Sequence, residues 1–173
     1  FCMMIVFTLF FGKLAKIPSD GLPYSIFNYT AMVVWTYFST AITGSSNSLI
    51  GSSSLISKVY FPRLFIPLTP ILAGLLDFII AFLVVSCMMC YYRIYPTIMV
   101  LFLPVLSLLM VLSATGVGLI FSAMNAKYRD IQYTIPFLTQ FWMFATPIVY
   151  PASLVPERYR MIYALNPMTG IVE

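Results

Sequence analysis

Long uncharged stretches, separated by short polar segments, run through the whole sequence. Asp, Glu, Lys and Arg are absent from 21–57, 94–126 and 131–156, and 64–92 contains only Asp77. A helix needs about 20 mostly apolar residues to cross about 30 Å of hydrocarbon, so each stretch can hold one span. The apolar runs do not alternate with polar residues, as strands of a membrane β-barrel would. The pattern predicts an all-α, polytopic helical membrane protein.

The predicted elements belong to one transmembrane domain, 1–173. Residues 1–11 would rise only about 16 Å as a helix, so we interpret them as the end of a first span that begins earlier. Residues 151–170 are interrupted by prolines and polar residues, so re-entrant or exit-side helices are expected there instead of a span. Full spans are predicted at about 25–50, 64–90, 96–124 and 132–150.

The composition supports this fold class and argues against catalytic, metal and cofactor sites. Hydrophobic residues make up 61% of the chain and charged residues 8%, against about 25% charged in soluble domains. The chain contains no His, and Cys87 and Cys90 lie in an apolar run where helix packing is favoured over a metal or redox site. No Gly-rich phosphate loop, paired carboxylates or nucleophile–base signature occurs. We therefore predict no catalytic site, no metal site and no cofactor bound by this chain.

Small residues recur at helical spacing in two of the predicted spans. Such stripes let helices approach closely in lipid, so helix packing is favoured over pore lining. The stripes are Thr40, Gly44, Ser48 and Ser52 in one span and Ala114, Gly118 and Ser122 in another.

Asp77 is the single acidic residue within a predicted span. It lies 14 residues past Arg63, about 21 Å along a helix and therefore near the membrane interior. An intramembrane acid is a candidate ion site or proton relay. Because no other ionisable residue is expected at that depth, a structural hydrogen bond is favoured.

A short amphipathic helix is predicted between the second and third spans. Residues 52–62 begin with serines that can cap a helix and end at Pro62, which cannot continue one. Two uses remain open. The helix either anchors at the membrane surface, with Lys58 and Arg63 on lipid phosphates, or presents a rigid projection to a soluble partner. Its apolar face comprises Leu55, Ile56, Val59 and Tyr60.

Aromatic residues account for 17% of the chain, and a group of them gathers in 137–150. They either face a translocation path, where flat apolar surfaces suit sugar rings, or form an interfacial belt facing lipid. The group consists of Phe137, Phe141, Trp142, Phe144 and Tyr150, with Gln140 among them.

Five motifs together resemble the permease subunits of ABC exporters for O-antigen, teichoic acid and related polysaccharides. The resemblance covers essentially the whole chain. It implies six spans with both ends cytoplasmic, so the sequence would lack the amphipathic N-terminus, part of span one and span six. The motifs, in family order, are "LISKVYFPRLFIPL", "NAKYRDIQY", "FATPIVYP", "LVPE" and "LNPMTGIVE".

The resemblance also implies roles for particular residues. Residues 52–63 would be cytoplasmic and contain the coupling helix that docks on an ATPase subunit, a second cytoplasmic turn would follow the fourth span, and the aromatic group of 137–150 would line or border the path. The coupling residues would be Ser54, Leu55, Ile56, Lys58, Val59, Tyr60, Phe61 and Arg63, the turn residues Lys127, Arg129 and Asp130, and the path residues Phe137, Gln140, Phe141, Trp142, Phe144 and Tyr150.

By the same resemblance, two permease copies would form the path in the plasma or bacterial inner membrane. Two ATPase subunits would bind ATP and Mg and drive export of a lipid-linked glycan, with membrane lipid around the permease and no nucleic-acid partner. Two alternatives are an ABC exporter of a drug or small lipid, and a gradient-driven transporter or channel using Asp77. A membrane-embedded transferase ranks last, because clustered acids or His are absent.

Overall fold

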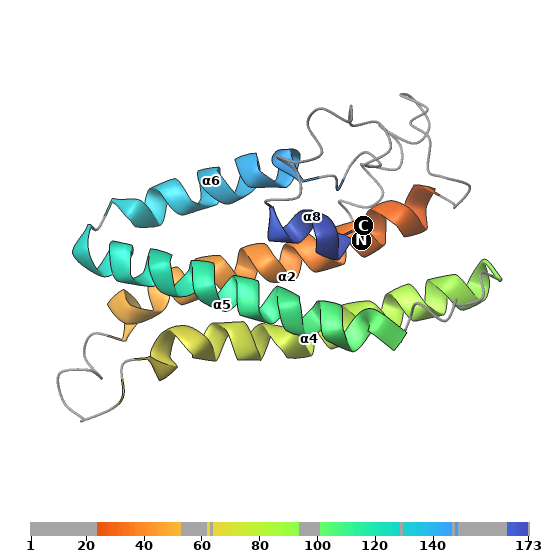
Figure 1. The fold of residues 1–173 in the computed structure, drawn as a ribbon, viewed down its shortest axis with the longest axis horizontal. Coiled ribbons are helices and arrows are strands. Elements are labelled where there is room, and N and C mark those ends of the chain that lie inside the picture. Colours follow the sequence, from red (N-terminus) through yellow and green to blue (C-terminus); the bar gives the residue numbers. More distant parts are fainter. Residues whose placement is uncertain are drawn as a thin grey trace.

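The computed structural model describes residues 24–52, 62, 64–93, 101–128, 130–146, 148 and 166–172. Most of these residues are helical, and within them no strand occurs (Figure 1). The all-α class predicted from the sequence is thereby confirmed. In chain order the helices are α2 (Tyr24–Gly51), α4 (Phe65–Tyr91), α5 (Leu103–Lys127), α6 (Ile131–Ala145) and α8 (Pro167–Val172).

Two helices in the described part of the chain, α4 and α5, are long and apolar enough to cross a membrane. Their 27 and 25 residues rise about 40 and 38 Å, more than the roughly 30 Å of a hydrocarbon core. Helix α4 lies within one residue of the predicted 64–90. Helix α5 begins later than the predicted 96, with Pro104 in its first turn, where the missing N–H of proline costs nothing.

Helix α6 ends two residues before a proline, Pro147. The predicted fifth span reached residue 150, whereas the helix ends at Ala145. Thr146 precedes Pro147 and is extended, with φ −106° and ψ 140°. Steric contact with the proline ring disfavours the α conformation in the preceding residue, which explains this end.

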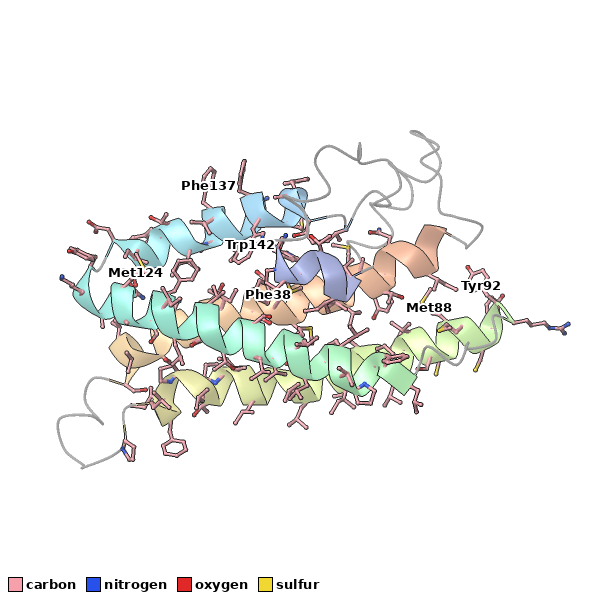
Figure 2. All side chains as sticks on the ribbon, viewed as in Figure 1. Phe38, Met88, Tyr92, Met124, Phe137 and Trp142 are labelled. Atoms are coloured by element: carbon pink, nitrogen blue, oxygen red, sulfur yellow. The ribbon has the colours of Figure 1, made fainter. Side chains whose placement is uncertain are left out.

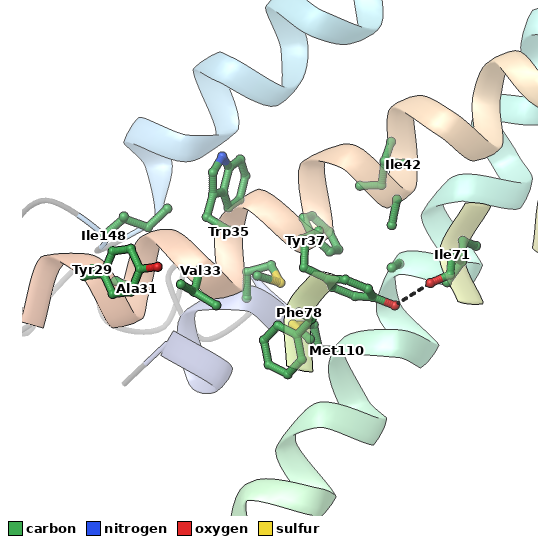
Figure 3. Close-up of a cluster of buried hydrophobic side chains, with 14 of the residues drawn as sticks. Tyr29, Ala31, Val33, Trp35, Tyr37, Ile42, Ile71, Phe78, Met110 and Ile148 are labelled. Carbon is green, nitrogen blue, oxygen red and sulfur yellow. Dashed lines mark hydrogen bonds between the residues drawn. The ribbon is translucent and has the colours of Figure 1, made fainter. Parts of the chain in front are cut away.

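Helix α2 lies at the centre of the arrangement. It packs along α4 and α5 and also contacts α6 and α8, while α4 and α6 lie on opposite sides of the α2–α5 pair (Figure 1). Its side chains at Phe38, Ala41 and Ile42 are almost completely buried. Facing residues of the other elements, including Met110 and Ile148, complete one apolar core (Figure 3).

The contact between α2 and α4 combines a small residue with a proline. A Cβ added to Gly44 would lie 2.9 Å from the Cβ of Pro70, so only glycine permits this approach without a shift. Nearby, the Tyr37 hydroxyl donates a hydrogen bond of 3.1 Å to the Ile71 carbonyl (Figure 3). Gly44, part of the first small-residue stripe, therefore serves helix packing.

The contact between α2 and α5 is equally close. A Cβ on Gly118 would lie 2.9 Å from Ser45 Oγ. Towards the C-terminal end of α5, the Asn125 side-chain amide donates to the Ser46 carbonyl at 3.0 Å and to Asn47 Oδ1 at 3.1 Å. The second small-residue stripe thus faces α2, and its residues Ala114, Gly118 and Ser122 are all buried.

The sides of α4 and α5 that face away from α2 are lined with large apolar side chains. Such surfaces suit lipid or another membrane helix and would be unfavourable in water. The most exposed aliphatic side chains are Leu72, Leu76, Ile80 and Leu83 on α4 and Leu108, Leu112 and Ile120 on α5.

Candidate functional site

Helix α6 has a buried side and an exposed aromatic side. Its buried residues are Ile135 and Thr139, and Thr139 directs its hydroxyl back to the helix carbonyls of Ile135 and Pro136. The opposite side carries aromatic rings at intervals of four, four and three residues, which places them in one row along the helix. Their exposures are 76% for Tyr133, 73% for Phe137, 70% for Phe141 and 55% for Phe144.

The structure brings together four of the six path-lining candidates on this aromatic row. Phe137, Phe141 and Phe144 belong to it, and Gln140 is exposed beside them. Phe137 points away from the other helices (Figure 2). Rings in this position offer flat apolar surfaces, and the Gln140 amide adds donors and an acceptor beside them.

Trp142 differs from the other candidates because its ring turns inward. It packs edge-on against Phe38 of α2, with ring centroids 5.4 Å apart and an interplanar angle of 87° (Figure 2). Its indole Nε1 donates to Asn166 Oδ1 at 3.2 Å. Trp142 therefore holds α6 against α2 and the start of α8. Tyr150, the sixth candidate, lies outside the described residues.

Asn166 connects the end of α6 to the beginning of α8. Its Oδ1 accepts hydrogen bonds from Trp142 Nε1 and from the Met168 N–H, the latter at 3.1 Å. Its Nδ2 donates to Thr146 Oγ1 at 2.9 Å, and the Thr146 hydroxyl donates in turn to the Trp142 carbonyl at 3.0 Å. The bond to Met168 satisfies an N–H of the first turn of α8, as N-cap residues do.

Two of the three residues predicted for the turn between α5 and α6, Lys127 and Asp130, are described by the structure. The Lys127 ammonium lies 5.2 Å from the centroid of the Tyr128 ring, within range of a cation–π interaction. Asp130 is exposed and immediately precedes α6, and its carbonyl accepts a hydrogen bond from the Tyr133 N–H at 3.2 Å. Arg129 lies outside the described residues.

The predicted coupling helix also lies outside the described residues. Its role stays a prediction, and so do the exit-side helices within 151–165. The coupling residues concerned are Ser54, Leu55, Ile56, Lys58, Val59, Tyr60, Phe61 and Arg63.

Asp77 is exposed near the middle of α4. It lies 12 residues past Phe65, where α4 begins, about 18 Å along the helix. Large apolar side chains at Leu76 and Ile80 flank it on the same exposed side. Among the described residues no group of three or more His, Cys, Asp or Glu could hold a metal ion, so the structure gives no support to a metal site at Asp77.

Sequence reasoning did not select Tyr133, Asn166 or Asn125. Tyr133 was recoverable, because it lies four residues before Phe137 and continues the aromatic spacing. Asn166 immediately precedes Pro167, and Asn followed by Pro is a signal for the start of a helix. Nothing in the sequence indicates that Asn125 of α5 bonds to α2, because that contact joins residues 79 positions apart.

Comparison with known proteins assigns this chain to a family. A family model described as "ABC-2 type transporter" matches residues 1–173. The chain belongs to the ABC-2 type transporter family. The resemblance inferred from the five motifs is confirmed, and a membrane location follows for this ABC-2 chain, in agreement with the apolar helices α4 and α5.

Individual relatives of the ABC-2 chain are named for O-antigen export or polysialic acid transport. It is 27% identical over 171 residues to the O-antigen export system permease protein RfbA of Myxococcus xanthus, covering 98% of this chain and 65% of the relative. A protein of the same name from Klebsiella pneumoniae is 27% identical over 173 residues, 99% of this chain and 65% of the relative. The polysialic acid transport protein KpsM of Escherichia coli is 34% identical over 67 residues, 39% of this chain and 26% of that protein. The chain thus spans about 65% of the length of the O-antigen permeases it matches.

Proposed function

We propose that this chain is part of the transmembrane permease subunit of an ATP-driven exporter for a lipid-linked polysaccharide. The observation that carries the proposal is the match along essentially the whole chain to two proteins named O-antigen export permeases. The similarity to a polysialic acid transport protein supports the same class of cargo. The proposed location is the plasma membrane or bacterial inner membrane, with several helices crossing it.

The exposed aromatic side of α6 is the proposed contact surface for the glycan. A polymer that slides through a path needs weak contacts that can be exchanged from one sugar to the next. Aromatic rings provide such contacts, because they attract the apolar face of a sugar without fixing it by directional hydrogen bonds. The row Tyr133, Phe137, Phe141 and Phe144 runs along nearly the whole of α6. A second permease copy would close the path opposite this row.

The inward side of α6 is proposed to keep this row in a constant orientation. Trp142 packs against Phe38, and Asn166 binds both Trp142 and Thr146. Rotation of α6 about its axis would break these contacts. The contacts of Trp142 support a positioning role for its side chain and leave the exposed rings as the proposed path-lining groups.

The chemical energy is proposed to come from two ATPase subunits, which hold the ATP and Mg. The supporting features are membership of the ABC-2 family and the absence of any catalytic signature in the sequence. The segment 52–63, directly after α2, is the proposed docking point. An ATPase subunit can drive the permease only if it binds one permease conformation more tightly than the other.

Removal of the aromatic rings tests the proposed contact surface. In the full-length permease with its ATPase, Phe137→Ala and Phe141→Ala should lower export of the lipid-linked glycan, measured as glycan delivered across the membrane per unit of ATP hydrolysed. Each lost aromatic contact is worth about 0.5–1.5 kcal/mol, or roughly 2- to 12-fold. Thermal stability should not change, because both side chains are exposed.

The matched control is Leu108→Ala on α5, which removes a similarly exposed apolar side chain, 59% accessible. Export by this variant should equal that of the wild type. Normal export by the Phe137→Ala, Phe141→Ala double variant would refute the assignment of α6 as the glycan contact.

A further inference from the structure

The contact between α2 and α5 encloses polar oxygen atoms that have no protein partner. The side chains of Ser45 and Ser46 are 0% exposed, and those of Ser122 and Asn125 are 1% exposed. The three serine hydroxyls and Asn125 Oδ1 make no hydrogen bond in the structure. Buried polar groups in proteins are nearly always hydrogen-bonded, because desolvation without a partner costs free energy.

These atoms are grouped around one short stretch of the contact. Ser45 Oγ lies 2.9 Å from the position of a Cβ on Gly118, and Ser122 follows Gly118 by one turn on the same side of α5. Asn125, almost one turn further on, reaches the Ser46 carbonyl with its amide nitrogen at 3.0 Å. The four residues that carry the unpaired oxygens are therefore neighbours, either along one helix or across the contact between α2 and α5.

The hydroxyls of Ser45, Ser46 and Ser122 differ from neighbouring hydroxyls, which donate a hydrogen bond to a carbonyl of their own helix. Serine and threonine in helices commonly donate to a carbonyl three or four residues earlier. Ser48 does so to the Ser45 carbonyl at 2.6 Å, Thr43 to Ser39 at 2.8 Å and Thr115 to Val111 at 2.7 Å. The hydroxyls of Ser45, Ser46 and Ser122 make no such bond.

We propose that α2 and α5 enclose a binding site for ordered water, held by Ser45, Ser46, Ser122 and Asn125. Buried water characteristically makes two to four hydrogen bonds to otherwise unpaired polar groups. Hydroxyls both donate and accept, as water does, whereas a cation site needs acceptors only. The four groups are uncharged, which favours water over a cation.

The position of the site gives water a short route of entry. Ser122 is five residues before the end of α5, and Ser45 is six residues before the end of α2, about 8 and 9 Å along the helices. Asn47, next to the site, is exposed. Water that enters by this route can hydrogen-bond to the buried hydroxyls while Gly118 keeps α2 and α5 in close contact.

The first experiment tests whether Ser122→Ala raises or lowers the melting temperature of the permease. In the full-length permease purified with its partner subunit, Ser122→Ala should lower the melting temperature by roughly 2–4 °C, because the variant loses a bond to the bound water. A melting temperature equal to or above that of the wild type would overturn the proposal, because removal of an unpaired hydroxyl from a dry contact is stabilising or neutral.

The second experiment detects the water itself and excludes a direct bond between serines. Cys2, Cys87 and Cys90 are first replaced by serine, and Ser122→Cys or Ala114→Cys is then introduced. A brief X-ray pulse converts bound water to hydroxyl radicals, which oxidise an adjacent thiol. Ala114 is the matched control, because it is buried on the same side of α5 as Ser122 but is apolar.

We expect oxidation of the thiol at residue 122 to be at least about five times faster than at residue 114, because only residue 122 would have bound water next to it. Equal rates would overturn the proposal. A cation in the site would also overturn the proposal. In that case, replacing K⁺ by Na⁺ would raise the melting temperature of the wild type but would leave that of Ser122→Ala unchanged.

Discussion

At the scale of single residues, two glycines determine how closely the helices approach α2. Gly44 of α2 admits Pro70 of α4, and Gly118 of α5 admits Ser45 of α2, each where an added Cβ would come within 2.9 Å of a neighbouring side-chain atom. Van der Waals packing is the main attraction between helices in lipid, where apolar burial gives little advantage. Close approach at these positions therefore contributes directly to the stability of the bundle.

Gly118→Ala is predicted to destabilise the bundle, and Gly116→Ala serves as its control. The new methyl group at 118 meets both Oγ and Cβ of Ser45, at 2.9 and 3.0 Å, and such overpacking costs about 1–3 kcal/mol. At Gly116 nothing lies within 4 Å of the added Cβ, so higher helix propensity should leave stability equal or up to about 1 kcal/mol greater. Thermal unfolding in detergent measures both. Equal melting temperatures for the two variants would contradict the role of Gly118.

At the scale of elements, α6 is a helix whose two sides have different tasks. Its exposed side carries the aromatic row, and its inner side is attached to α2 and α8 through Trp142 and Thr146. Asn166 is the point at which both attachments meet. A single amide thus connects the proposed glycan surface to the start of the next helix.

Asn166→Ala is predicted to loosen α6 from α8. The variant loses the acceptor for Trp142 Nε1 and the Met168 N–H and the donor to Thr146. Three such bonds at about 0.5–1.5 kcal/mol each give a destabilisation of roughly 2–4 kcal/mol. Asn166→Asp keeps both acceptor bonds and should lose less than half as much. The measurement is the free energy of unfolding of the purified permease, and equal values for the two variants would argue against this network.

At the scale of the whole molecule, α2 is the helix on which the others are assembled, and it leads directly into residues 52–63. The large apolar surfaces of α4 and α5 remain outward. Movement of α2 would therefore be passed to α4 and α5 through the Gly44 and Gly118 contacts. The proposed docking point for an ATPase subunit, 52–63, therefore follows the helix that contacts every other described helix.

Lys58→Glu combined with Arg63→Glu is predicted to leave the permease inserted in the membrane but to uncouple ATP hydrolysis from export. Reversal of two charges replaces attraction with repulsion at the proposed docking surface. The assay follows ATPase activity and glycan export in the same vesicles. Lys13→Glu with Lys16→Glu, two reversals in the segment before α2, should leave the ratio of export to hydrolysis unchanged, because alternation of the predicted spans places that segment on the other side of the membrane from 52–63. Normal export by the first variant would count against the coupling segment.

Much of the helical framework was predictable, because charge is so costly in hydrocarbon that the uncharged stretches mark the helices. The predicted 25–50 and 64–90 differ from α2 and α4 by a single residue at each end. The candidate site was less predictable. Phe137 and Phe141 could be selected from their aromatic character, but Trp142 has the same character and turns inward to Phe38.

The sequence by itself determined that this is an all-α membrane protein of the ABC-2 family and where its main helices lie, because apolar runs and ordered motifs are local properties of the chain. Only the tertiary structure decided which helices each side contacts and, where no stripe of small residues marks it, which side faces inward. A membrane helix is apolar on all sides, so the contrast between polar and apolar residues that orients a helix in a soluble protein is largely missing. The orientation of Trp142 and the pairing of Gly118 with Ser45 instead depend on close packing between residues far apart in the chain.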